Sequence, residues 1–289
     1  MNPLLQKQMA AAIKLKTDTE FQDFVDLLYL QAHGTHFTSL KQKRDKGGDG
    51  ILNGNTILAA YAPETYSLTD FKKKITSDYK KYEANWKPTH PNWLVITNCE
   101  LLANMVQHID SKHAGAEKLG VAEIVTKIEG LSWSKIRRIG EYLGIASELL
   151  MNDLLGQVID DLIRMDEKGL ATSQRPHALY IEEKIAINYG PEEVQQATDQ
   201  YTDSLEYFDA TQSILQSHTT TELRAIRSRI VGDFTTLGGR FSQRFNSLIA
   251  RYCEKSPNDD LYRFAIVVVL TFFFEQCLIG ARTTGETVC

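Results

Sequence analysis

The residues best suited to chemistry lie in a short glycine-rich stretch, Gly47-Gly48-Asp49-Gly50. Glycine permits the positive φ values of a tight turn, so this stretch would hold the Asp49 carboxylate at a fixed point. Carboxylates are ligands for hard cations such as Mg²⁺, although one alone coordinates Mg²⁺ poorly. The alternative is an ordinary turn in which Asp49 accepts backbone N–H bonds and stabilises its own loop.

Basic residues lie on both sides of this stretch. If both groups face one side of the domain, they form a phosphate-binding rim on a protein whose net charge is −5. The alternative is a solvated helix face, which suits Lys80 and Lys81 better. The basic residues are Lys41, Lys43, Arg44 and Lys46 before Asp49, and Lys72, Lys73, Lys74, Lys80 and Lys81 after it.

The elements around Asp49 predict a small α/β domain. Apolar residues at helical spacing predict a helix over residues 17–33, and a strand is expected at 36–40. The Asn53-Gly54 pair predicts a β-hairpin, because both residues tolerate positive φ. A helix over 67–86 follows, and the wholly apolar run 93–97 indicates a strand buried on both faces of a mixed sheet flanked by helices.

These pieces resemble the PD-(D/E)XK (restriction endonuclease-like) superfamily, in the branch whose motif runs GxxGxDG before a strand ending in YAP. The resemblance covers about residues 17–100 and rests on FQDFVDLLYLQAHG, KGGDGIL, TILAAYAPE and NWLVITN. It implies a deoxyribonuclease in which carboxylates hold Mg²⁺ against the scissile phosphate and a lysine orients water. Asp49 would then be the first metal carboxylate, and Glu20 or Asp23 the acid from the first helix.

One part of the family pattern is missing. The second motif, Glu/Gln–x–Lys, falls on Ala59-Ala60-Tyr61, so its acid and lysine would have to come from elsewhere. Glu64 and the run Lys72–Lys74 are the nearest such groups. We therefore expect catalysis by Asp49, Glu20, Glu64 and Lys73, Mg²⁺ on Asp49 and Glu20, and DNA contacts from Lys43, Arg44, Lys46, Lys72 and Lys74.

Beyond about residue 100, helical patterns dominate and no strand is expected. This predicts an α+β protein, with a nuclease-like domain over 1–115 and an all-helical domain over 116–289. One long helix is expected over 221–253, with an apolar stripe from Leu223 to Tyr252, a kink or a close helix crossing at Gly238-Gly239, and arginines that border a bundle or a partner interface. The run Phe264–Phe274 is apolar all round but 11 residues long. A bilayer helix needs roughly 20 residues, so this run predicts a buried helix.

The closing stretch LTFFFEQCLIG resembles the final helix of bacterial ABC three-component (Lamassu-like) conflict-system proteins. That resemblance implies docking to an ABC or SMC-type ATPase complex. The combined expectation is an effector subunit of a prokaryotic antiphage or anti-plasmid defence complex, with a DNA endonuclease that partner subunits hold in check. The alternatives are a catalytically inactive nuclease-like subunit that binds nucleic acid or supports assembly, and a stand-alone helical interaction protein.

Composition and the missing motifs exclude several classes. Four scattered cysteines with no CxxC pair argue against structural zinc, and the N-terminus reads as a first helix, so we expect a cytoplasmic protein without disulfides. No Walker loop, Rossmann fingerprint or GxSxG elbow occurs, which leaves ATPase, dehydrogenase and hydrolase functions without support.

Overall fold

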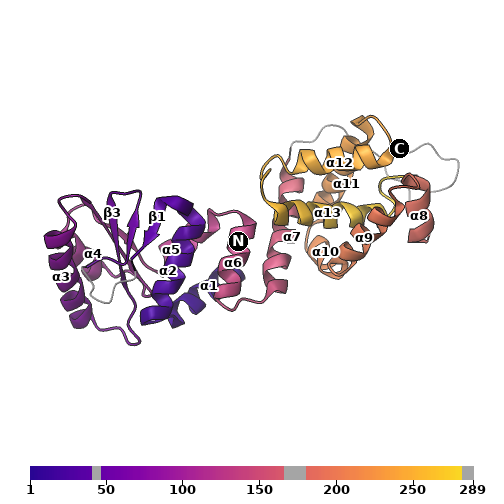
Figure 1. The fold of residues 1–289 in the computed structure, drawn as a ribbon. Helices are drawn as coiled ribbons and strands as arrows, with labels where there is room; N and C mark the ends of the chain where they lie inside the picture. Colours follow the sequence, from indigo (N-terminus) through magenta and orange to yellow (C-terminus); the bar gives the residue numbers. More distant parts are fainter. Residues whose placement is uncertain (41–46, 166–179, 282–289) are drawn as a thin grey trace. The chain divides into compact units, whose positions relative to one another are not determined.

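The computed structural model describes residues 1–40, 47–165 and 180–281. The chain forms two compact units, Met1–Ser147 and Glu148–Cys289 (Figure 1). The first unit contains a five-stranded sheet with helices, and the regular secondary structure among the described residues of the second unit is helical. The expected α+β class is therefore confirmed at the level of its coarse layout.

The sheet of the first unit is mixed, as expected. Its order is β1-β2-β3-β4-β5, antiparallel from β1 to β3 and parallel from β3 to β5. Asn53 and Gly54 have φ values of 51° and 68°, which confirms their predicted role in the hairpin turn. The strands are β1 Phe37–Ser39, β2 Gly50–Leu52, β3 Thr56–Tyr61, β4 Asn92–Thr97 and β5 Glu117–Leu119.

Helices cover both faces of the sheet. On one face, α3 and α4 pack against β3 and β4, where Trp93 and Val95 are fully buried beside Phe71 and Ile75 of α3. On the other face lie α2 and α5 (Figure 1). The helices of this unit are α1 Pro3–Leu15, α2 Asp18–His33, the 3₁₀ turn η1 Gly34–His36, α3 Leu68–Asn85, α4 Ala103–Lys112, α5 Val121–Glu129 and α6 Trp133–Tyr142.

The first unit extends past the expected boundary at residue 115. Strand β5 begins at Glu117 and pairs in parallel with β4, so the expectation of no strand after residue 100 was wrong. After β5, α5 buries Val121, Ile124 and Ile128 completely. The compact unit consequently ends at Ser147.

The second unit is built around α13, Asp260–Glu275. Its residues from Val268 to Phe274 are all buried, which confirms the predicted buried helix. Asp259 caps it by accepting the backbone N–H groups of Leu261 and Tyr262. None of the described helices is long and apolar enough to cross a membrane. The other helices are α7 Ser147–Arg164, α8 Ile181–Asn188, α9 Val194–Leu205, α10 Phe208–Gln216, α11 Thr220–Thr236 and α12 Phe241–Tyr252.

The prediction of a single helix over 221–253 is wrong, because α11 ends at Thr236 and α12 begins at Phe241. Gly238 and Gly239 lie in the break, and Gly239 has a φ of 101°, outside the helical range. The Arg244 guanidinium donates to the Phe234 carbonyl, which is one of the last in α11. The apolar stripe survives as two shorter buried faces.

Among the described residues, three buried basic side chains donate hydrogen bonds to carbonyl groups at the C-terminal ends of helices. Arg229 donates to the carbonyls of Leu162 and Met165 at the end of α7, and Arg244 to that of Phe234 in α11. Lys184 donates to the Phe274 carbonyl of α13. Cations are favourable at helix C-termini, where carbonyl groups lack partners within the helix. Arg229 and Arg244 are therefore buried between helices of the unit, in agreement with the expectation that arginines border a bundle.

Candidate functional site

Asp49 borders a cavity of about 350 Å³ at the carboxyl end of β3. The parallel strands β3 and β4 end here, a position where open α/β sheets commonly bind ligands. Three parts of the first unit supply its charged and amide side chains: Asp18 and Gln22 from α2, Asp49 from the turn immediately before β2, and Lys74 from α3. The remaining walls are formed by Thr19, Phe21, Ala60, Tyr61, Ala62 and Pro63.

Hydrogen bonds fix the Asp49 carboxylate. Its Oδ2 accepts the backbone N–H of Ala60 at 2.7 Å, and its Oδ1 accepts the Gln22 side-chain amide at 3.3 Å. Its backbone pairs with Leu58 and Leu40, which extends the ladder by one residue beyond β2. Asp49 thus stabilises its own turn, which is the structural role expected of it, and it also lines a cavity.

The glycines of the stretch are required by close packing. Gly47 has a φ of 85°, and a Cβ there would lie 2.7 Å from the Asp78 carbonyl oxygen and 2.8 Å from the Tyr82 nitrogen of α3. At Gly50, a Cβ would lie 2.5 Å from the Phe37 ring. The loop therefore passes directly against α3, which brings Asp49 near the flank of that helix carrying Lys74.

The cavity contains Lys74, whereas Lys73, the predicted catalytic lysine, lies outside it. The Lys74 ammonium group donates to the Asp78 carboxylate at 2.9 Å, and Asp78 is buried. Lys73 does not line the cavity; its side chain is 74% exposed, with its Nζ 3.6 Å from Asp70. Lys74, expected to contact DNA, is thus the lysine beside Asp49.

The carboxylate that α2 contributes to the cavity is Asp18, whereas Glu20 and Asp23, the two acids expected from this helix, do not line it. Asp18 lines the cavity, has an unusual φ of 44° and donates its backbone N–H to the Ala62 carbonyl. Non-glycine residues with positive φ often occur at functional sites, where the surrounding structure holds them. The Glu20 side chain is 70% exposed and lies 3.6 Å from Lys16, and Glu64 is exposed and also outside the cavity.

Helical geometry could have identified these residues. The buried face of α2 carries Phe21, Val25 and Leu28. At roughly 100° per residue, Asp18 and Gln22 fall on one flank of that face and Glu20 on the other. The same reasoning puts Lys74 beside the buried face of α3 and Lys73 nearly opposite it.

The lysines of α3 are divided between two places. Lys72, Lys73 and Lys80 line a shallow hollow with His108 of α4, away from Lys74. Burial lowers the pKa of His108, and the positive charges of Lys112 and Lys72 lower it further. The expected single rim is therefore split across α3. Lys43, Arg44 and Lys46 lie outside the described residues.

The cavity offers two carboxylates, one ammonium group and one phenol. Mg²⁺ is often held by one or two carboxylates together with water and substrate phosphates. Asp49 and Asp18 suit an open site of that kind better than a closed site in which the protein supplies every ligand. Within the described ranges, no group of three or more His, Cys, Asp or Glu side chains is placed to hold a metal. Burial raises the pKa of Tyr61, which keeps its hydroxyl a hydrogen-bond donor.

Comparison of the chain with protein-family models, curated proteins and solved structures found no match.

Proposed function

We propose that the first unit is a metal-dependent DNA endonuclease domain of the PD-(D/E)XK type. The observation that carries the proposal is the meeting of Asp49, Asp18 and Lys74, from three separate elements, around one cavity. The order of α2, β1 to β3, α3 and β4 supports it, because that order accompanies an acidic turn in the superfamily that the sequence resembles. Lys74 takes the place of the lysine missing from Ala59-Ala60-Tyr61.

Each residue has a distinct part in this proposal. Asp49 and Asp18 would hold Mg²⁺, which supplies Lewis-acid stabilisation of a phosphate oxygen when bound. Gln22 and the Ala60 backbone hold the Asp49 carboxylate in one orientation. Lys74 places positive charge at the cavity, where it stabilises the developing negative charge of a phosphodiester. Asp78 positions Lys74 from the next turn of α3.

The cellular role rests on the resemblance of the closing helix. We propose that the protein is the effector of a prokaryotic antiphage or anti-plasmid complex, and that its helical unit docks to an ABC or SMC-type ATPase. Copurification of the ATPase with the full chain from its native host, and its loss when Asp260 and Arg263, the exposed residues of the otherwise largely buried α13, are changed, would test this part separately.

The catalytic part is tested by plasmid cleavage with Mg²⁺ or Mn²⁺. We expect Asp49→Asn to reduce the cleavage rate by about a hundredfold or more, and Lys74→Gln by a similar factor, because each removes charge from the reacting centre. Asparagine is preferred to alanine because its carbonyl can still accept the Ala60 N–H.

Two controls are built into the same helices. Lys73→Gln removes an exposed charge next to Lys74, and Glu20→Gln removes one two residues from Asp18. We expect both variants to cleave at a rate within about twofold of wild type. The proposal fails if wild-type protein does not cut DNA with either metal, or if Lys73→Gln is as damaging as Lys74→Gln.

A second candidate is a catalytically inactive domain that binds DNA, which the Ala59-Ala60-Tyr61 sequence and the Lys74–Asp78 ion pair favour. It predicts salt-dependent binding without cleavage. Fluorescence anisotropy between low and moderate salt would then show that Lys72→Gln or Lys80→Gln reduces the salt slope by about one. Asp49→Asn would leave that slope unchanged.

A further inference from the structure

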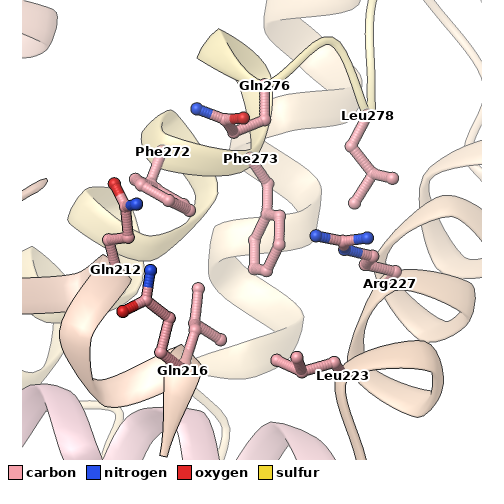
Figure 2. A pocket seen from close by; sticks show the side chains of 9 residues that line it. Gln212, Gln216, Leu223, Arg227, Phe272, Phe273, Gln276 and Leu278 are labelled. Atoms are coloured by element: carbon pink, nitrogen blue, oxygen red, sulfur yellow. The ribbon is translucent and has the colours of Figure 1, made fainter. Parts of the chain in front are cut away.

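A second cavity lies within the helical unit, remote in sequence from the Asp49 site. It occupies about 330 Å³ between α10, α11 and the end of α13 (Figure 2). Leu215 of α10 with Phe272 and Phe273 of α13 form its apolar wall, and all three side chains are largely buried. The Phe273 ring projects into the middle of the cavity (Figure 2).

Among the described residues that line this cavity, Arg227 of α11 is the one that carries a charge, and no acidic side chain is with it. Its guanidinium is directed toward the side of Phe273 (Figure 2). Arg227 has no hydrogen bond or ion pair with any other described residue. Across the cavity, Gln212 and Gln216 are four residues apart on α10, which puts both amides on one face.

The backbone beside the cavity is also unusual. Cys277, a non-glycine residue with a φ of 55°, lies between the lining residues Gln276 and Leu278. This conformation turns the chain after α13, so that Leu278 closes the side of the cavity near Arg227 (Figure 2). Residues held in such conformations often occur where a chain surrounds a ligand.

We infer that this cavity binds a small amphipathic anion. An aromatic ring or short alkyl chain would pack on Phe272, Phe273 and Leu215, and a carboxylate, sulfonate or phosphate would pair with Arg227. A volume of about 330 Å³ is near the lower end for small-molecule pockets, roughly 300–1,000 Å³. It suits one ring with a short acidic arm better than a peptide segment. Arg227 excludes cations, and its fork favours a planar or tetrahedral anion.

The test compares 4-phenylbutyrate with 4-phenylbutan-1-ol, which has the same apolar body and no charge. Isothermal titration calorimetry on the full chain should give an acid affinity about fivefold to tenfold higher than that of the alcohol, because the Arg227 contact is charge-assisted but partly exposed. Arg227→Gln should abolish this difference and leave alcohol binding unchanged.

Arg224 provides the matched control, since it is exposed on the same helix and does not line the cavity. Arg224→Gln should preserve the preference for the acid, and circular dichroism should show that both variants remain folded. The inference is overturned if neither compound binds at millimolar concentration, if acid and alcohol bind equally, or if Arg224→Gln and Arg227→Gln weaken acid binding equally. None of these results bears on DNA cleavage, so this inference and the proposed function can fail independently.

Discussion

The position of Asp49 depends on Gly47 having no side chain, because the Gly47 backbone packs directly against α3. The backbone of Gly47 lies so close to Asp78 and Tyr82 that no side chain fits between them. Because those neighbours are backbone atoms of a packed helix, they cannot move independently. A larger residue must therefore push the loop away from α3 and separate Asp49 from Lys74.

We predict that Gly47→Ala lowers the free energy of unfolding of the first unit by roughly 2 kcal/mol or more, through positive-φ strain and collision with α3. Gly54→Ala is the control, because Gly54 also has a positive φ, 68°, but has open space around it. It should cost about 1 kcal/mol. Urea denaturation followed by circular dichroism measures both; equal losses would show that collision with α3 contributes nothing.

At the scale of the elements, the helical unit ends its helices with buried cations. Arg229 comes from α11 but closes α7, and Arg244 comes from α12 but closes α11. Each bond brings a charged donor to a carbonyl group in the last turn of a helix and links that helix to another. The Arg244 guanidinium also lies over the Phe234 ring, with its Cζ 4.1 Å from the ring centroid, which strengthens the link between α12 and α11.

We predict that Arg229→Met destabilises the helical unit by about 2–3 kcal/mol, because two carbonyl groups at the end of α7 lose a charged donor. Methionine keeps most of the side-chain volume, so the loss reports the hydrogen bonds and not a cavity. Arg224→Met, on the exposed side of α11, should change stability by less than about 0.5 kcal/mol. Differential scanning calorimetry would decide; a neutral Arg229→Met would mean that water replaces the guanidinium.

Local patterns predicted most elements of the first unit but not all. The hairpin at Asn53-Gly54 and the capping residue Ser67 of α3 could be predicted because a few adjacent residues determine them. Strand β5 could not, because three residues, Glu117–Leu119, form a strand only where β4 offers its edge. The break between α11 and α12 falls at Gly238-Gly239, where Gly239 has a φ of 101°, and the helical periodicity of the flanking residues continues across it, which is why the pattern alone predicted one helix.

Of the residues that line the candidate site, Asp49 was predicted, whereas the accompanying acid and lysine were assigned to the wrong positions. Asp49 was identified from the glycines around it and from the order of elements that resembles the PD-(D/E)XK superfamily. Glu20 and Lys73 were chosen for their residue type. The positions of the residues around each helix instead favour Asp18 and Lys74, which line the cavity. Gln22 was not identified at all, because an amide that orients a carboxylate carries no charge signal in the sequence.

At the scale of the whole molecule, the two units set the limits of independent folding. Met1–Ser147 includes β5 and the helices that pack on it. A fragment that stops at residue 115 would leave the edge of β4 unpaired and expose the apolar surface that α5 covers. Unpaired edges and exposed apolar faces favour aggregation.

We predict that a fragment of residues 1–147 is monomeric and unfolds cooperatively, whereas one of residues 1–115 aggregates or lacks a thermal transition. Analytical ultracentrifugation and thermal melts of both fragments would test this. A cooperative 1–115 fragment would mean that β5 and α5 are only an addition to a complete fold.

Helix α3 carries Lys72, Lys73 and Lys74 in succession. Which of them faces the cavity depends on its position along the helix as much as on its residue type. Deleting one residue from the first turn of α3 would rotate every later side chain by about 100°, so the lysine run would survive while a different lysine met Asp49. Two relatives with the same count of basic residues could then differ in activity. A comparison of such proteins should count positions from the capping serine, Ser67, before it counts charges.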